Sequence, residues 1–177
     1  MPRLFTALEL PSDVAAALAL SRGGIFGARW IDPENYHITL RFIGDINARL
    51  ADEVAESLED VSQMKAPVSF EALSWFGGGK PRAIVAKVKP TAELSDLAAD
   101  HERRFRRLGL AAETRNFTPH VTLARMRGVT PAAVADYLTS RGRLAAAPFV
   151  AERFVLMSAR DGVGGGPYVV EAEFALT

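Results

Sequence analysis

The alternation of apolar and polar residues predicts short strands separated by amphipathic helices. Strand segments are short, rich in β-branched and aromatic residues, and bounded by Pro or Gly. They span residues 3–10, 36–42, 68–75, 83–89, 120–125, 149–157 and 168–176. Helical segments combine an apolar stripe with a residue that suits a helix start. They span residues 12–21, 48–61, 91–108 and 131–140.

Turn and cap residues separate these elements. Ser12 and Thr91 each precede a helical segment where a side-chain oxygen can cap it, and Gly109 follows the end of the third helical segment. The run Gly77-Gly78-Gly79-Lys80 has some likeness to a phosphate cradle, but Pro81 and a strand follow it where a P-loop needs a helix. We therefore expect a plain hairpin or loop there.

The order strand, helix, strand, helix, strand occurs twice along the chain, which indicates an internal duplication. We therefore expect a single α+β domain with pseudo-twofold symmetry, made of two lobes at about residues 1–76 and 83–177. In this arrangement two antiparallel-rich sheets line a central cleft, and the amphipathic helices lie outside.

The duplication carries a short motif with it. His37-Ile38-Thr39-Leu40 and His120-Val121-Thr122-Leu123 lie 83 positions apart and contain two of the three histidines. In a strand, the period of two places the histidine and the threonine on one face. One such tetrapeptide is weak evidence, because a histidine in a strand is usually a hydrogen-bonded structural residue. Two copies at equivalent places indicate one shared polar site.

Composition restricts the chemistry of this site. The chain has no cysteine, which excludes thiol nucleophiles, disulfides and zinc–thiolate sites. Lys plus Arg and Asp plus Glu both number 21, so a nucleic acid would be contacted locally rather than held by overall charge. The apolar run 14–20 follows Glu9 and Asp13, where a secretion signal needs positive charge. We expect a cytoplasmic monomer.

Three kinds of chemistry use paired imidazoles. Metal ligation is poorly supported, since no further histidine or cysteine accompanies either motif. Nucleophilic catalysis needs Ser or Cys beside a base, and neither is evident. General acid–base catalysis needs one protonated and one neutral group near neutral pH, which two histidines with ordinary pKa values near 6.5 provide. We favour this chemistry, with no metal or other cofactor.

The threonines indicate the substrate. Residues two apart on a strand lie about 6.6 Å apart on one face, so Thr39 and Thr122 can each reach a group bound beside the neighbouring histidine. Two hydroxyl donors suit the non-bridging oxygens of a phosphate diester, and an arginine would complete the anion site. Strand alternation nominates Arg41, whereas Arg125 would need a bulge or a strand end to face the site.

Beyond these residues, the sequence resembles the two-histidine phosphoesterases, and among them the bacterial RNA 2′,3′-cyclic phosphodiesterases, also called 2′-5′ RNA ligases. The resemblance covers essentially the whole chain, on RLFTA, RWI, HITLRFIG, KPR and FTPHVTLAR at residues 3–7, 29–31, 37–44, 80–82 and 117–125. The glycine-rich segment 160–168 departs from the family pattern. The resemblance implies a bilobal fold and metal-independent opening of a 2′,3′-cyclic phosphate at RNA ends or short oligoribonucleotides to a 2′-phosphate. Run backwards, the same site would ligate a 2′-phosphate to a 5′-hydroxyl.

The resemblance also implies a role for each motif residue. His37 would protonate the departing 3′ oxygen and His120 would take a proton from the attacking water, although two similar strands leave the reverse assignment open. Thr39 and Thr122 would hold phosphate oxygens.

Other residues are weaker candidates for substrate contacts. Arg125 matches the family's arginine after the second motif, so we expect it to bind the phosphate and keep Arg41 as an RNA-backbone contact. Tyr168 is our best candidate for stacking on a base. Phe5 and Phe42 are more readily explained as core residues.

The remaining titratable candidates are interpreted structurally. His101 stands between two acidic residues in a helical segment, which predicts a solvated surface position. A basic cluster is favourable near a helix C-terminus and could also guide an RNA end. It comprises Arg103, Arg104, Arg106 and Arg107, with Arg115 further along.

Two other functions stay open at this point. One is a phosphodiesterase of the same superfamily that acts on another small cyclic phosphate. The other is a non-catalytic protein that binds RNA ends. Both motifs are intact, threonines included, which favours catalysis.

Overall fold

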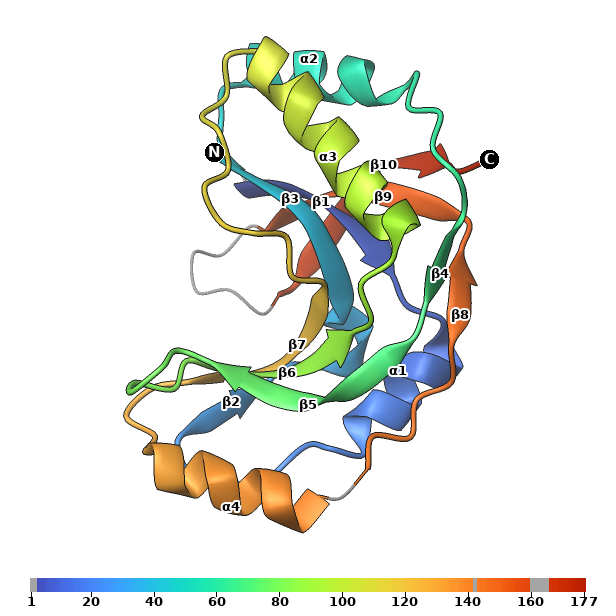
Figure 1. The fold of residues 1–177 in the computed structure, drawn as a ribbon. Coiled ribbons are helices and arrows are strands. Elements are labelled where there is room, and N and C mark those ends of the chain that lie inside the picture. Colours follow the sequence, from blue (N-terminus) through green and yellow to red (C-terminus); the bar gives the residue numbers. More distant parts are fainter. Residues whose placement is uncertain (1–2, 142, 160–165) are drawn as a thin grey trace.

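The computed structural model describes residues 3–141, 143–159 and 166–177, and within them it has the α+β architecture expected from the sequence (Figure 1). The strands are β1 (Arg3–Glu9), β2 (Ala28–Trp30), β3 (His37–Asp45), β4 (Ala66–Val68), β5 (Phe70–Phe76), β6 (Ala83–Val88), β7 (His120–Met126), β8 (Phe149–Ala151), β9 (Arg153–Ala159) and β10 (Tyr168–Ala175). The helices are α1 (Ser12–Ala19), α2 (Ala48–Leu58), α3 (Ala92–Arg107) and α4 (Pro131–Arg141), with a 3₁₀ turn at Pro33–Asn35.

One antiparallel sheet runs through the molecule in the order β10-β9-β1-β3-β7-β6-β5, with β2 beside β7. β3 and β7 pair at a single position, Ile38 with Val121, and β2 takes over beside β7 from Ala124 onward. The sheet therefore divides into two lobes, β10-β9-β1-β3 and β2-β7-β6-β5, which diverge from this junction (Figure 1).

The lobes differ from the successive halves that we predicted. β9 and β10, from the end of the chain, extend the sheet beyond β1, whereas β5, from the first half, pairs with β6. Each half forms one pair of strands, β1 with β3 and β6 with β7. The outer strand of each pair, β1 or β6, then has one edge without a partner from its own half. A strand from the other half covers that edge and satisfies its backbone groups. The lobes are therefore interleaved in sequence.

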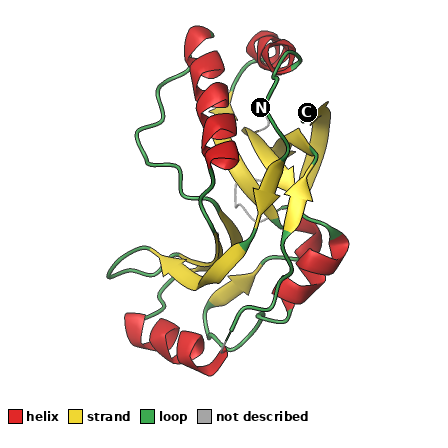
Figure 2. Ribbon diagram, turned by 45° about the vertical axis from the view of Figure 1, so that its right-hand side comes forward, coloured by secondary structure: helices red, strands yellow, loops and turns green. Residues whose placement is uncertain are grey.

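Helices pack on the outer side of the strands (Figure 2). α3 lies against β3 and is flanked by α2, and α4 contacts β5. The main core fills the space between helices and sheet, with Phe105, Phe154 and Leu123 fully buried in it or against it. A smaller cluster of Phe5, Ala7, Val155 and Met157 lies on its own, away from that core.

Local sequence patterns predicted most of the helices and strands and missed a few. The Thr91 hydroxyl accepts a hydrogen bond from the Leu94 amide at 3.2 Å, as expected of a cap, whereas α1 begins after Pro11 without a side-chain cap from Ser12. The predicted strand 149–157 is interrupted at Glu152 and forms β8 and β9. β2 was missed because it has only three residues.

The turn between β5 and β6 is a hairpin, as predicted. Gly77 has a φ of +123°, and a Cβ there would lie 2.3 Å from the carbonyl oxygen of Lys80. Only glycine fits this close approach of backbone to backbone. Within the described part of the chain, no helix is both long and apolar enough to cross a membrane.

Candidate active site

The two histidine motifs meet where the lobes join. Ile38 and Val121 are direct antiparallel partners, and both side chains are completely buried in the main core. Because successive side chains of a strand alternate between faces, the residues that flank this pair face away from the core. The one position at which β3 and β7 pair is therefore also the centre of the predicted site.

The register sets the arrangement of the four motif residues. With Ile38 opposite Val121, an antiparallel register brings His37 across from Thr122 and Thr39 across from His120. All four side chains are partly buried. Each histidine therefore has one threonine two residues along its own strand and another across the junction.

Both imidazoles are held in the same way. Nδ1 of His37 lies 2.9 Å from the carbonyl oxygen of Asn35, and Nδ1 of His120 lies 2.7 Å from that of Thr118. A carbonyl oxygen only accepts, so each Nδ1 carries the hydrogen and each Nε2 is left for proton transfer. The Thr39 hydroxyl, 3.0 Å from Nε2 of His37, donates to it when the ring is neutral.

Aromatic side chains enclose His37. Its ring centroid lies 4.9 Å from that of Phe5 and 4.9 Å from that of Tyr168, which meets it edge-on. Burial among these rings is the main reason that the pKa of His37 falls from 6.5 to about 4. The Asn35 carbonyl opposes this shift, whereas the charge of Arg125 adds to it.

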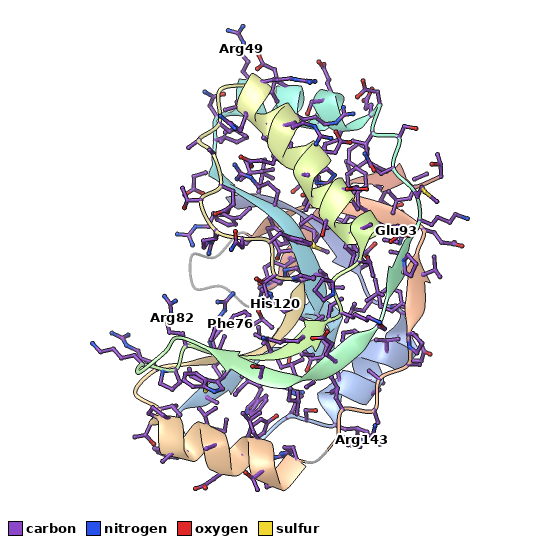
Figure 3. The ribbon with its side chains drawn as sticks, viewed as in Figure 1. Arg49, Phe76, Arg82, Glu93, His120 and Arg143 are labelled. Atoms are coloured by element: carbon purple, nitrogen blue, oxygen red, sulfur yellow. The ribbon has the colours of Figure 1, made fainter. Side chains whose placement is uncertain are left out.

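His120 has a less complete enclosure. The ring of Phe76 meets it edge-on at 4.8 Å, and both side chains extend toward the space between the lobes (Figure 3). Burial lowers the pKa of His120, the Thr118 carbonyl opposes the change, and Arg125 and Arg115 lower the pKa further. Both imidazoles are therefore neutral at pH 7 in the free protein.

Arg41 does not follow strand alternation. Thr6 pairs with Arg41 and Ala7 pairs with Thr39, so Leu40 is an extra residue that forms a bulge in β3. The bulge turns Arg41 toward α3, where its 9% exposed side chain binds Glu102 and the carbonyl oxygens of Phe42 and Ala111. Strand alternation therefore did not predict the side on which Arg41 lies. Its guanidinium is occupied by these protein partners, and a contact with the RNA backbone stays a prediction.

The equivalent bulge in β7 has the opposite consequence for Arg125. Ala124 pairs with Ile84 and Thr122 pairs with Val85, so Leu123 is the extra residue. Alternation resumes after it, and Arg125 returns to the face of the histidines. Its charge lowers the pKa of both histidines, as expected for a cation close to each ring.

The aromatic residues of the site come from four strands. Tyr168, our candidate for base stacking, lies at the start of β10 beside His37, whereas the glycine-rich segment 160–165 before it lies outside the described residues. Phe5 is 5% exposed and forms part of the small cluster, as expected of a core residue. Phe42 pairs with Phe5 and is 43% exposed on the same face. Sequence reasoning missed Phe76, because only its place before the glycine turn distinguishes it.

His101 is a correction to the sequence-based interpretation. It is fully buried against Phe154, with Nδ1 2.8 Å from the hydroxyl of Thr6, and burial lowers its pKa to about 3. The acidic neighbours suggested a surface position, but His101 lies on the buried face of α3 and its ring contacts β1. His101 thus belongs to the interior and lies apart from the two motif histidines.

Part of the basic cluster is engaged within the protein. Arg104 binds Asp60 and Asp100, and Arg103 also contacts Asp100. Arg115 pairs with Glu113. These ion pairs support the structural interpretation of the cluster. The described residues contain no group of three or more His, Asp or Glu side chains that could hold a metal ion.

Comparison with known proteins agrees with this geometry. The model of a family described as LigT-like phosphoesterase matches the chain twice, over residues 8–85 and 86–168. Each match contains one of the motifs, with His37 in the first and His120 in the second. The family pattern therefore repeats as the fold does.

Individual relatives are similar over most of their length. The RNA 2′,3′-cyclic phosphodiesterase of Archaeoglobus fulgidus is 28% identical over 163 residues, which is 90% of this chain and 87% of the relative. That of Aquifex aeolicus is 29% identical over 153 residues, 84% and 81% of the two chains. The solved structure of E. coli LigT complexed with 3′-AMP superposes with a TM-score of 0.83 at 22% identity, covering 100% of this chain and 99% of that one. It has the same fold.

Proposed function

The chain belongs to the LigT-like phosphoesterase family, and we propose that it hydrolyses 2′,3′-cyclic phosphate ends of RNA to 2′-phosphates by acid–base catalysis between His37 and His120. The observation that carries this proposal is the pairing of Ile38 with Val121, which sets the two histidines and two threonines around one centre. The curated relatives named as RNA 2′,3′-cyclic phosphodiesterases support the choice of substrate.

The phosphate is held by groups on both motif strands. The hydroxyls of Thr39 and Thr122 donate to the two non-bridging oxygens, and the guanidinium of Arg125 neutralises their charge. To do this, the Thr39 hydroxyl turns from Nε2 of His37 to the phosphate, which frees that nitrogen for the reaction. Binding the substrate thus prepares the acid–base pair.

Proton transfer follows from the tautomers. The water oxygen attacks phosphorus while its proton passes to Nε2 of His120. The bond from phosphorus to the 3′ oxygen breaks, and Nε2 of His37 gives that oxygen its proton. The products are a 2′-phosphate and a 3′-hydroxyl, and exchange with solvent restores both imidazoles.

This assignment places a condition on His37. Its pKa is about 4 in the free protein, so it has to gain a proton when the substrate binds. An anion within about 4–6 Å favours the protonated form of a histidine, and the bound phosphate is such an anion. Exchanging the two roles would relax this condition on His37 and impose a similar one on His120.

With the 5′-hydroxyl of a second RNA in place of water, the same site would form a 2′-5′ linkage, because that oxygen attacks phosphorus as the bond to the 3′ oxygen breaks. In water, hydrolysis dominates because water greatly exceeds RNA ends in concentration. Two imidazoles also supply both proton transfers without a metal, so we propose a metal-independent reaction. The cytoplasmic location and the monomeric state stay predictions.

The test uses purified protein treated with EDTA and a short oligoribonucleotide that ends in a 2′,3′-cyclic phosphate. We expect turnover to a 2′-phosphate, identified by its resistance to enzymes that remove only 3′-phosphates. His37→Asn and His120→Asn proteins should each lose about 10²- to 10⁴-fold in kcat while still binding the RNA. Turnover that appears only after metal is returned would refute the metal-independent mechanism, and full activity in either variant would remove that histidine from it.

A further inference from the structure

A basic groove continues along β7 beyond the candidate active site. It is lined by five residues, of which three are arginines: Gly27, Arg29, Arg125, Met126 and Arg127. Arg125 is shared with the phosphate site, so the groove begins where the predicted reaction takes place. The groove follows β2 and the C-terminal half of β7, on the opposite side of the junction from β3.

The arginines face one another across the strands. Arg29 on β2 is the direct partner of Arg125 on β7, so the two side chains lie on the same face of the sheet. Arg125 and Arg127 are exposed and two residues apart. Within the described residues, neither of these two forms an ion pair with an acidic side chain. An anion bound in the groove would offset the positive charges of Arg125 and Arg127.

The groove gathers arginines in a chain that carries no net charge. The net charge is zero, and other arginines, such as Arg41, Arg104 and Arg153, are engaged with carboxylates. A local excess of positive charge along one groove is therefore a feature of this place rather than of the overall composition.

An exposed aromatic residue adjoins the groove. Phe26 directly precedes Gly27, and its side chain is completely exposed, at 102% of the reference area. Gly27 itself lies against the backbone of Arg127, so the loop that carries Phe26 is close to the groove. A cationic groove beside an exposed aromatic ring is the combination that binds single-stranded nucleic acid, in which phosphates take the charges and a base takes the ring.

We propose that Arg29, Arg125 and Arg127, with Phe26, bind the nucleotide that precedes the cyclic-phosphate end, so that oligoribonucleotides are preferred to cyclic mononucleotides. This inference rests on the proposed function and adds the path of the RNA to it. The cyclic end lies at His37 and His120, and the chain leaves along β7 toward the α1–β2 loop. Arg125 bridges the reacting phosphate and the next one.

The test compares two substrates, a 2′,3′-cyclic mononucleotide and a single-stranded tetranucleotide with a 2′,3′-cyclic end. We expect a higher kcat/KM for the tetranucleotide, and we expect this preference to shrink as salt rises. Arg127→Gln should lower kcat/KM for the tetranucleotide about 5- to 10-fold and reduce its log–log salt slope by about 0.7, the change for one lost phosphate contact on a single strand. Phe26→Ser should lower it about 5-fold without changing the salt slope.

Arg49→Gln is the matched control. It removes the same charge on α2, far from the site, where Arg49 pairs with Glu53 (Figure 3). Two results would refute RNA binding in the groove. One is an equal loss of kcat/KM on both substrates in Arg127→Gln, and the other is an equal loss in Arg127→Gln and Arg49→Gln.

A binding measurement separates this inference from the proposed function. Anisotropy of a labelled tetranucleotide ending in a 3′-phosphate reports the groove without any turnover. If neither cyclic substrate is hydrolysed but binding still weakens in Arg127→Gln, the proposed hydrolysis is refuted and RNA binding in the groove is supported. If hydrolysis occurs and Arg127→Gln binds the tetranucleotide normally, RNA binding in the groove is refuted and the proposed hydrolysis is supported.

Discussion

Phe42 and Arg125 occupy equivalent positions, each five residues after the histidine of its strand and each beyond a one-residue bulge. Both side chains are exposed on the face that carries the histidines. The duplicated scaffold thus presents an aromatic ring on β3 where it presents a cation on β7. The site is symmetric in its histidines and threonines and asymmetric at the positions of Phe42 and Arg125.

Replacing Arg125 tests this asymmetry. Loss of a hydrogen bond to a charged group removes about 1.5–3 kcal/mol, so Arg125→Gln should lower kcat/KM for the cyclic oligonucleotide by about 10- to 100-fold. The kcat/KM of Arg125→Lys should lie between those of the wild type and Arg125→Gln, because an ammonium keeps the charge but not the planar geometry of the guanidinium. Steady-state kinetics with Arg49→Gln as control measure the effect, and near wild-type activity in Arg125→Gln would show that another group neutralises the phosphate.

The pH dependence of kcat/KM follows from the two histidines. The reaction needs one protonated and one neutral histidine, and in the free protein burial has lowered both pKa values below 6.5, that of His37 to about 4. The optimum of kcat/KM should therefore lie between about pH 4 and 6.5 and fall toward pH 8, whichever histidine is the acid. Tyr168→Ala opens the enclosure of His37 and should move the acid limb to higher pH. A flat profile from pH 5 to 8 would contradict the mechanism.

Arg41 separates a structural role from a role in RNA binding. Its guanidinium holds Glu102 and the carbonyl of Ala111, and Glu102 also accepts from the amide of Glu113, so this group ties the segment before β7 to α3. Arg41→Gln should reduce the free energy of unfolding by about 1–3 kcal/mol in urea titrations and change KM for the cyclic oligonucleotide less than twofold. A raised KM with unchanged stability would support an RNA contact instead.

The sequence predicted which motif residues meet at the site better than it predicted the residues around them. Two tetrapeptides at equivalent places in a repeat were enough to bring His37 and His120 together, because strand periodicity fixes which residues share a face. The bulges at Leu40 and Leu123 carry no comparable signal. They reverse that periodicity, and they decide that Arg125, and not Arg41, faces the site.

Long-range pairing also escaped prediction. The exchange of β5 and β9 between the halves depends on which open edge a strand covers, and local patterns do not encode that choice. His101 was placed at the surface because its neighbours in sequence are charged. In the structure His101 lies on the buried face of α3, four residues from both Leu97 and Phe105, and its ring contacts Thr6 of β1.

The buried His101 should make the protein sensitive to acid. In the unfolded chain its pKa is near 6.5, whereas burial holds it at about 3 in the folded protein, with Asp100 opposing the shift and Arg104 adding to it. Between these values the unfolded state binds a proton that the folded state does not, so stability falls as pH falls through this window, by up to about 1.4 kcal/mol per pH unit. Above pH 6.5 this contribution is constant.

A double variant isolates this contribution. His101→Leu removes the titrating group, and Thr6→Val removes the hydroxyl that would otherwise be left buried without a partner. His37 titrates in both proteins, so the difference between them belongs to His101. From pH 7 to pH 5, urea titrations should show the wild type losing about 1–2 kcal/mol more than the double variant. Equal losses would mean that His101 gains its proton as readily inside the fold as outside it, which the buried contact with Phe154 argues against.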